Sequence, residues 1–384
     1  MLFAEVAGQD KVKKKLIAAV KRDRISHAQL FFGPEGCGSL ALGIAYAQYI
    51  ACPDKNDDDS CGECPSCRKF NKLEHPDLHF SFPVNTTQQV PKDPVSDEFI
   101  KEWREFILKN AYFRSENWYN HIGIENKQGL ISRKEGEAII RKLSMKPYES
   151  EYKFVIIWLP EKMNKESGNI LLKTIEEPSQ NTVLIFISED PGQLLPTISS
   201  RLQPVKLDRI ADEDIKKNIE DKYELSGAEL DNISRLSAGN YIRALEIIDE
   251  TEENEFNFEK FVELVRMCYK RDYLGLNGWV EELSATGRER LKSFFLYTLR
   301  LIRENFIMNI QRDELNYLAD KEKDFSNDFH PYINGKNVIP LTKEINRAFN
   351  DIERNAYAKI VLFDLMIRII KLIPTKKQLE QEED

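Results

Sequence analysis

A glycine-rich loop constrains the fold more than any other feature of this sequence. It runs from residue 33 to 40 as Gly-Pro-Glu-Gly-Cys-Gly-Ser-Leu, after an apolar run at 29–32 and before a helical pattern at 40–50. A strand, a glycine-rich loop and a helix in this order are typical of a phosphate-binding loop, whose backbone N–H groups hold phosphate at the helix N-terminus. The sequence therefore predicts an α/β fold that contains such a loop.

The loop lacks the side chains with which such motifs bind a nucleotide. Its glycines, Gly33, Gly36 and Gly38, lie near the positions of the G-x4-G-K-[S/T] signature. Ser39 stands where the signature has lysine, and Leu40 stands where it has the hydroxyl that binds Mg²⁺. We therefore interpret the segment as a degenerate phosphate loop and expect no ATP there. The alternative, a glycine-rich turn unrelated to nucleotides, fits the order of strand, loop and helix less well.

Four further apolar runs predict strands, at 78–82, 153–159, 183–188 and 205–207. Strands that alternate with helical patterns indicate a parallel sheet covered on both faces. An ATPase of this kind needs an acidic pair at the end of its third strand, but Trp158 and Leu159 stand there and Glu161 follows two residues late. We therefore expect no hydrolysis, and Glu161 as an unusual catalytic base is the alternative.

Four of the six cysteines, Cys52, Cys61, Cys64 and Cys67, fall within sixteen residues. In a reducing compartment such a cluster indicates a metal site rather than disulfides. Four thiolates close a structural Zn²⁺ site, whereas an iron–sulfur cluster is the rival because Cys-x2-Cys-x2-Cys also occurs in ferredoxins. We favour zinc, because the fourth cysteine lies upstream and no second cluster is visible. Cys37 and Cys268 are predicted to pack as small hydrophobic residues.

The chain divides by pattern into an α/β part and two helical parts. The predicted domains are 1–208, with the cysteine module at 52–67 and an insertion at 83–130, then 209–250, 251–374 and a polar tail at 375–384. The charged stretch 251–255 is predicted to be a linker. The insertion contains prolines and aromatic residues, and we interpret it as a surface segment with one or two helices.

Charge and hydropathy limit the classes of protein that remain. There are 64 acidic and 55 basic residues, a formal charge of −9, which argues against a uniformly basic nucleic-acid-binding surface. No apolar run approaches the roughly 20 residues that span a membrane. The first residues show no secretory pattern. We expect a cytoplasmic protein without membrane partners.

Short motifs in the first 250 residues carry a resemblance to a known family. They are Gly8-Gln-Asp10, Ser26-His-Ala-Gln-Leu-Phe31, the loop at 33–40, the four cysteines, His75-Pro-Asp77, Leu171-Leu-Lys-Thr-Ile-Glu-Glu-Pro178, Leu195-Pro-Thr-Ile-Ser-Ser-Arg201 and 239–245. In these motifs the chain resembles the delta-prime subunits of bacterial DNA polymerase III, which are members of the clamp-loader AAA+ family. Beyond residue 250 the resemblance is limited to helical character and to Asn355-Ala-Tyr-Ala-Lys359.

The resemblance implies an AAA+ sheet domain with a zinc module, a three-helix lid and a helical collar domain that holds a five-subunit ring together. It implies a rigid subunit without ATPase activity of its own, within a DNA-directed DNA polymerase holoenzyme. The implied partners are the gamma/tau and delta subunits and, through the complex, the sliding clamp and primed DNA.

The resemblance also implies one catalytic residue that acts on another subunit. The family motif Ser-Arg-Cys maps to Ser200-Arg201-Leu202, so Arg201 is the candidate arginine finger for the ATP site of a neighbouring gamma subunit. A guanidinium at a γ-phosphate stabilises the charge that spreads in the transition state. Two other functions remain open: an active clamp-loader ATPase of the gamma/tau type, and a zinc-dependent nucleic-acid-binding protein.

Overall fold

The computed structural model describes residues 1–374 apart from 125–126, 224, 311–317 and 319. It divides into two compact units, Met1–Ile248 and Asp249–Asp384. The predicted polar tail, 375–384, lies outside the described residues.

The first unit contains the predicted five-stranded parallel sheet. Its strands are β1 (Ala28–Phe32), β2 (Leu78–Ser81), β3 (Lys153–Trp158), β4 (Thr182–Ser188) and β5 (Gln203–Lys206). They lie in the order β2-β3-β4-β1-β5, and every neighbouring pair is parallel. The carboxyl ends of β1, β3 and β4 therefore lie side by side, at the edge where the glycine-rich loop begins. The predicted α/β class, a five-stranded parallel sheet followed by helices, is confirmed.

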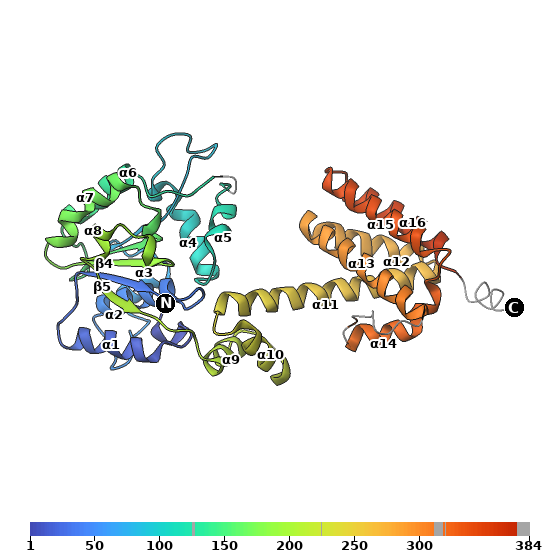
Figure 1. The fold of residues 1–384 in the computed structure, drawn as a ribbon, viewed down its shortest axis with the longest axis horizontal. Coiled ribbons are helices and arrows are strands. Elements are labelled where there is room, and N and C mark those ends of the chain that lie inside the picture. The colour runs from blue at the N-terminus through green and yellow to red at the C-terminus, as the bar shows by residue number, and fades with distance from the viewer. Residues whose placement is uncertain (125–126, 224, 311–317, 319, 375–384) are drawn as a thin grey trace. The chain divides into compact units, whose positions relative to one another are not determined.

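Two pairs of helices cover the two faces of the sheet (Figure 1): α1 (Asp10–Lys21) and α2 (Ser39–Ala51) on one face, α6 (Arg133–Ser144) and α7 (Lys165–Glu176) on the other. Strand β3 shows why both faces are covered. Phe154 and Ile156 enter the hydrophobic cluster with α1 and α2, whereas Val155 and Ile157 enter the cluster with α6 and α7. The apolar run Phe154–Trp158 of this strand is thus buried on both sides, as is typical of parallel sheets.

The remaining helices of the first unit surround this core. They are η1 (Phe3–Glu5), α3 (Pro65–Asn71), η2 (Ser96–Phe99), α4 (Ile100–Lys109), α5 (Ser115–His121), η3 (Pro160–Lys162), η4 (Pro191–Gln193), α8 (Pro196–Ser199), α9 (Asp212–Glu220) and α10 (Gly227–Ser237). Ser226 and Glu229 form a capping box at the start of α10 and satisfy backbone donors there.

The aromatic residues of the segment 83–130 are buried, which differs from the surface insertion that we predicted. The segment does form two α-helices, α4 and α5, but Trp103 and Trp118 have no exposed surface. The ring of Trp103 stacks on Phe82 with centroids 4.1 Å apart and meets Trp118 edge-on at 4.9 Å. The sequence analysis missed this packing because α4 and α5 bury aromatic rings that look like surface residues in a polar, proline-rich segment. An exposed aromatic binding surface is therefore excluded for these two residues.

The second unit is helical throughout its described residues. Its helices are the later part of α11 (Tyr241–Lys270), α12 (Tyr273–Ala285), α13 (Arg288–Asn309), α14 (Asp320–Phe329), η6 (His330–Tyr332), α15 (Val338–Glu353) and α16 (Ala358–Leu372). They enclose a separate hydrophobic core that includes Phe261, Phe294 and Leu362. The predicted linker at 251–255 is wrong, because α11 continues through it. Its glutamates favour helix, and no glycine or proline interrupts them.

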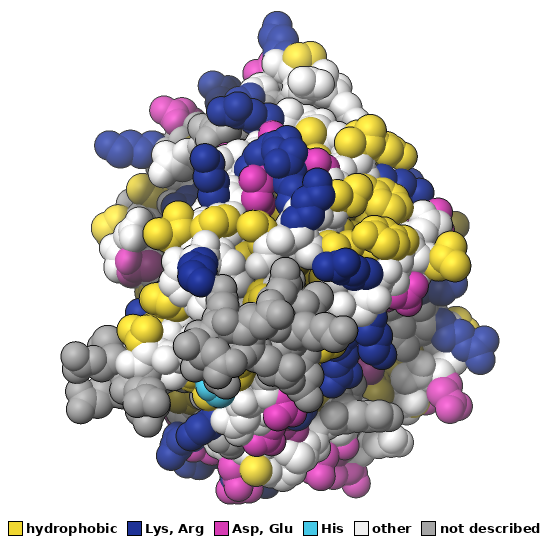
Figure 2. Space-filling view, turned by 90° about the vertical axis from the view of Figure 1, so that its right-hand side faces the viewer, with side chains coloured by type: hydrophobic (Ala, Val, Ile, Leu, Met, Phe, Trp, Pro, Cys, Tyr) yellow, Lys and Arg dark blue, Asp and Glu magenta, His cyan; other side chains and the backbone are white. Residues whose placement is uncertain are grey.

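The surface of the second unit carries apolar side chains. Ile339, Tyr357 and Ile360 are 73%, 65% and 68% exposed, in α15 and at the start of α16. Figure 2 shows the side of the molecule with the C-terminal helices, where hydrophobic side chains are interspersed with lysines and arginines. Among the described helices, none is long and apolar enough to cross a membrane.

Candidate functional site

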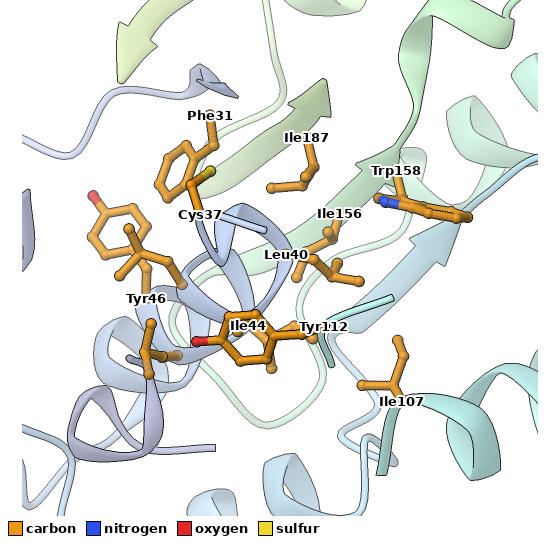
Figure 3. Packing of buried hydrophobic residues seen from close by; sticks show 14 of the residues in the cluster. Phe31, Cys37, Leu40, Ile44, Tyr46, Ile107, Tyr112, Ile156, Trp158 and Ile187 are labelled. Atoms are coloured by element: carbon orange, nitrogen blue, oxygen red, sulfur yellow. The ribbon is translucent and has the colours of Figure 1, made fainter. Parts of the chain in front are cut away.

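The glycine-rich loop has the predicted backbone setting, because it joins the end of β1 to the start of α2. Gly38 adopts a φ of 82° just before α2 begins at Ser39. The side chain of Leu40 is 5% exposed and belongs to the hydrophobic core. Figure 3 shows it beside Ile156, near Trp158. At this position the phosphate-loop signature has a serine or threonine that binds Mg²⁺. Leu40 instead points into the hydrophobic core.

A tyrosine from the 83–130 segment lies against the loop. The hydroxyl oxygen of Tyr112 accepts a hydrogen bond from the backbone N–H of Ala7 at 2.9 Å. Its ring lies 4.4 Å from the ring of Tyr241, measured between centroids. A Cβ atom at Gly38 would lie 2.9 Å from the Tyr112 ring, so only glycine fits there. Burial raises the pKa of Tyr112, which therefore stays protonated.

Polar side chains connect the loop to the start of α11. The side chain of Asn240 donates to Glu35 at 2.8 Å, and its oxygen would lie 1.9 Å from a Cβ atom at Gly36. The guanidinium of Arg114 donates to Glu35 at 2.9 Å and also pairs with Glu246. The hydrogen bond from Arg114 lowers the pKa of the Glu35 carboxyl. Arg114 is thus occupied by two carboxylates.

Little space and much negative charge remain at the loop. The cavity beside it, lined by residues that include Tyr112, Trp158 and Glu189, has a volume of about 40 Å³. Sites for small molecules have volumes of roughly 300–1,000 Å³. Desolvation of its carboxyl, followed by the negative charges of Glu161 and Glu35, raises the pKa of Glu189 to about 7. Part of the residue is nevertheless exposed to solvent. A polyphosphate would meet these acidic groups without a lysine to offset them.

The alternative catalytic base, Glu161, is engaged with the backbone. One of its carboxylate oxygens accepts from the N–H of Glu189 at 3.0 Å and more weakly from Asp190 at 3.4 Å. The residues where an acidic pair was sought, Trp158 and Leu159, are 3% and 1% exposed. Glu161 thus ties the end of β3 to the end of β4.

The four clustered cysteines converge in the structure. The sulfur atoms of Cys52, Cys61, Cys64 and Cys67 all lie within 4.8 Å of one another. The distance between sulfurs is 3.6 Å for Cys52 and Cys61 and 3.9 Å for Cys61 and Cys67. Four sulfurs at about 2.3 Å from a tetrahedral ion lie about 3.8 Å apart. This group can hold one metal ion, whereas a four-iron cubane would bind each thiolate through a different iron and spread them farther apart.

The backbone around the cysteines also suits thiolates. Backbone N–H groups donate to sulfur from Cys61 to Cys52 at 3.4 Å, from Cys64 to Cys61 at 3.3 Å and from Cys67 to Cys64 at 3.4 Å. The N–H groups of Cys64 and Glu63 lower the pKa of Cys61 to about 7. Such bonds orient and stabilise anionic metal ligands.

The two remaining cysteines pack as predicted. Cys37 and Cys268 are 3% and 1% exposed and lie in the cores of the first and second unit. Burial raises the pKa of the first to about 11 and of the second to about 12, so both stay thiols.

Arg201 lies on the surface of the first unit, just after the short helix α8. Its side chain is 37% exposed, and its guanidinium pairs with the carboxylate of Glu176 at the end of α7. It also donates to the backbone oxygen of Thr197 at 2.8 Å and to the hydroxyl of Ser200 at 3.3 Å. Three acceptors from its own chain therefore orient this guanidinium.

The sequence analysis missed three residues at the loop, namely Tyr112, Arg114 and Asn240. The glycine spacing already indicated that another group lies close to the backbone at Gly36 and Gly38. Nothing in the sequence identified the side chains that do so, Asn240 and Tyr112. The many aromatic residues at 83–130 were the one sequence signal that this segment packs against the rest of the domain.

The comparisons with known proteins identify the family of the chain. A family model described as "DNA polymerase III, delta subunit" matches residues 8–211. The chain is 26% identical to the DNA polymerase III subunit delta' of Bacillus subtilis over 68% of this chain and 66% of the relative. It is 29% identical to the subunit delta' of Pseudomonas aeruginosa over 47% and 42% of the two chains.

A relative with a different subunit name matches as well. The chain is 28% identical to the DNA polymerase III subunit gamma/tau of Mycobacterium tuberculosis, over 52% of this chain and 27% of the relative. In each of these three relatives the match covers less than two thirds of the length. Because the family model matches more than half of the chain, the chain belongs to the DNA polymerase III delta-subunit family, as a delta-prime-type member of the clamp-loader group.

Proposed function

We propose that this chain is a non-hydrolysing, delta-prime-type subunit of a DNA polymerase III clamp loader. In this role it assembles with gamma/tau and delta subunits in a five-subunit ring and helps to load the sliding clamp onto primed DNA. It binds no ATP itself, and it supplies Arg201 to the ATP site of a neighbouring subunit.

One observation carries the proposal: the chain's own side chains occupy its glycine-rich loop. Tyr112 packs on Gly38, Asn240 packs on Gly36, and a cavity of about 40 Å³ remains. Ser39 and Leu40 remove the cation and the metal ligand from the same site. Lost charge and lost volume both act against nucleotide binding.

Arg201 supports a role in trans through its exposure and orientation. A finger must reach a phosphate on another subunit, and a planar guanidinium can bind two phosphate oxygens at once. The acceptors at Glu176 and Thr197 hold the side chain at the surface before a partner arrives. Part of the entropy of ordering a long side chain is thus lost on folding rather than on assembly.

We propose that the cysteine group holds one structural Zn²⁺. Four thiolates leave no open position on a tetrahedral ion, so this ion would stabilise structure rather than react. It would join the end of α2, through Cys52, to α3, which begins at Pro65 after its N-cap Cys64. Phe70 of α3 in turn packs edge-on against Phe154 of β3 at 5.9 Å.

The second unit would serve in assembly. Its helices carry exposed apolar residues, among them Ile339 and Ile360, next to charged ones. Exposed apolar residues can form the core of a subunit interface, and charged residues around them can form its polar rim.

The experiment is reconstitution with and without this chain. The full chain should co-purify with the gamma/tau and delta subunits of the same cell. The ring that contains it should load the clamp and hydrolyse ATP in response to primed DNA, whereas the same mixture without the chain should do neither. A ring that forms and loads clamps equally well without the chain would contradict the proposed role.

A further inference from the structure

A second cavity, of about 330 Å³, lies in the first unit beside the edge strand β5. Residues of α1, α2, β1 and the segment between α1 and β1 complete its lining, and none of them lines the cavity at the glycine-rich loop. Its volume is within the range of small-molecule sites. Nothing in the proposed function uses it.

Three cations surround this cavity without acidic partners. Lys15, Arg24 and Lys206 line it, and no acidic side chain does. In the described part of the chain, none of the three forms an ion pair. Two other lysines of the same helix, Lys13 and Lys21, do pair with Asp10 and Asp57. Uncompensated positive charge around a hollow favours an anionic ligand.

The floor of the cavity is polar and buried. Gln29 and Tyr46 line it and are 3% and 1% exposed. The amide nitrogen of Gln29 donates to the backbone oxygen of Ser26 at 3.0 Å and to the hydroxyl of Tyr46 at 3.3 Å. This leaves the amide oxygen of Gln29 as an acceptor and the Tyr46 hydroxyl proton as a donor. An acceptor beside a donor is a pair that the edge of a nucleobase can match.

The edge strand itself does not favour pairing with an added strand. The N–H of Leu207 donates to the oxygen of Phe32 at 2.8 Å, so alternate residues of this segment face β1. By this alternation Pro204 faces outward, and proline has no N–H to offer a neighbouring strand. An extended peptide is therefore a poor occupant, and a hollow of about 330 Å³ favours a small one.

We propose that this cavity binds a nucleotide through its phosphomonoester, with the phosphate among Lys15, Arg24 and Lys206 and the base at Gln29 and Tyr46. Because no carboxylate lines the cavity, binding does not require Mg²⁺. Two kinds of ligand carry a nucleotide with a phosphomonoester: a free mononucleotide and the 5′-phosphorylated end of a nucleic-acid strand.

The test is a titration of the full chain, without Mg²⁺, with AMP and separately with a short 5′-phosphorylated DNA oligonucleotide. Arg24→Gln with Lys206→Gln should weaken binding more than tenfold. The matched control is Lys14→Gln with Arg22→Gln, which removes the same charge from exposed residues outside the cavity and should change affinity less than twofold. Gln29→Leu should abolish the preference for AMP over ribose 5-phosphate but retain phosphate binding.

The two probes distinguish the sources. Binding of AMP identifies a free nucleotide, and binding of the oligonucleotide that disappears with its 5′-phosphate identifies a strand end; either result supports the proposal. Failure of both probes to bind at millimolar concentration would overturn it. An equal loss of affinity in the control variant would overturn it too, because diffuse surface charge would then explain the binding. Neither outcome depends on clamp loading, so this proposal and the proposed function fail separately.

Discussion

The indole ring of Trp158 packs against the indole ring of Trp103, with centroids 5.2 Å apart. Trp158 stands at the end of β3, where an ATPase carries an acidic residue, and Trp103 comes from α4 of the 83–130 segment. One aromatic cluster thus joins the lost catalytic position to the segment that also supplies Tyr112. The position at the end of β3 and the 83–130 segment therefore share one aromatic cluster.

Restoring an acidic residue at this position should destabilise the protein. Trp158→Asp removes a large buried ring and places a carboxylate among aromatic residues, so we expect a loss of about 3–5 kcal/mol in the free energy of unfolding. Trp158→Phe should cost much less, because it keeps an aromatic ring in the cluster. Urea unfolding of both variants tests this, and equal stability of the aspartate variant and the wild type would refute it.

The wild-type chain should show no Mg²⁺-dependent binding of ATP. Ser39→Lys with Leu40→Thr restores the charge and the metal ligand, but Tyr112 still lies against the loop, so we expect appreciable binding only when Tyr112→Ala is added. Turnover should stay absent in all variants, because Trp158 and Leu159 remain. Calorimetry with and without Mg²⁺ is the measurement. Micromolar, Mg²⁺-dependent binding by the wild type would show that the loop is open.

The fold could be predicted from the sequence because β1, β3 and β4 contain continuous apolar runs and the glycine spacing is specific. The cysteine group could be predicted for a similar reason, since four thiols this close in sequence have few other uses. The occlusion of the loop could not, because Tyr112 reaches Gly38 through a contact between residues 74 positions apart. Local patterns describe periodicity, whereas this contact depends on how α4 and α5 pack on the sheet. The role of Arg201 stays a prediction, because its partner is on another chain.

Metal analysis of the chain, purified without chelator, should find one zinc per molecule. Cys64→Ser should lower the zinc content and the thermal midpoint, because it removes a thiolate ligand, whereas the serine hydroxyl can still accept the N-cap hydrogen bond of α3. Cys268→Ala is the matched control, since Cys268 lies in the core of the second unit and should leave the zinc content unchanged. Iron in place of zinc, or no metal, would contradict the assignment.

His79 should make stability depend on pH. Burial, followed by the charge of Lys142, lowers its pKa to about 4 from 6.5. Between these values the unfolded chain binds a proton that the folded chain does not, so stability falls as pH falls from 6.5 toward 4. Between pH 7 and pH 5, the free energy of unfolding should therefore fall by up to about 2 kcal/mol less in His79→Gln than in the wild type. Urea unfolding followed by tryptophan fluorescence at the two pH values tests this. An identical loss in the variant and the wild type would count against it.

The ATPase rate of a reconstituted ring that contains Arg201→Ala tests the central claim most directly. A partly exposed guanidinium contributes little stability, so the variant should fold and assemble normally. Clamp- and DNA-stimulated ATPase should fall, though only in part, because other sites in the ring keep their own arginines. Arg201→Lys should restore the rate poorly, since lysine lacks the planar fork that binds two oxygens. Arg22→Gln, which removes one positive charge from an exposed residue of the first unit, is the control and should leave the rate unchanged. A fully assembled Arg201→Ala ring with the wild-type rate would contradict the account, and the chain would then contribute structure alone.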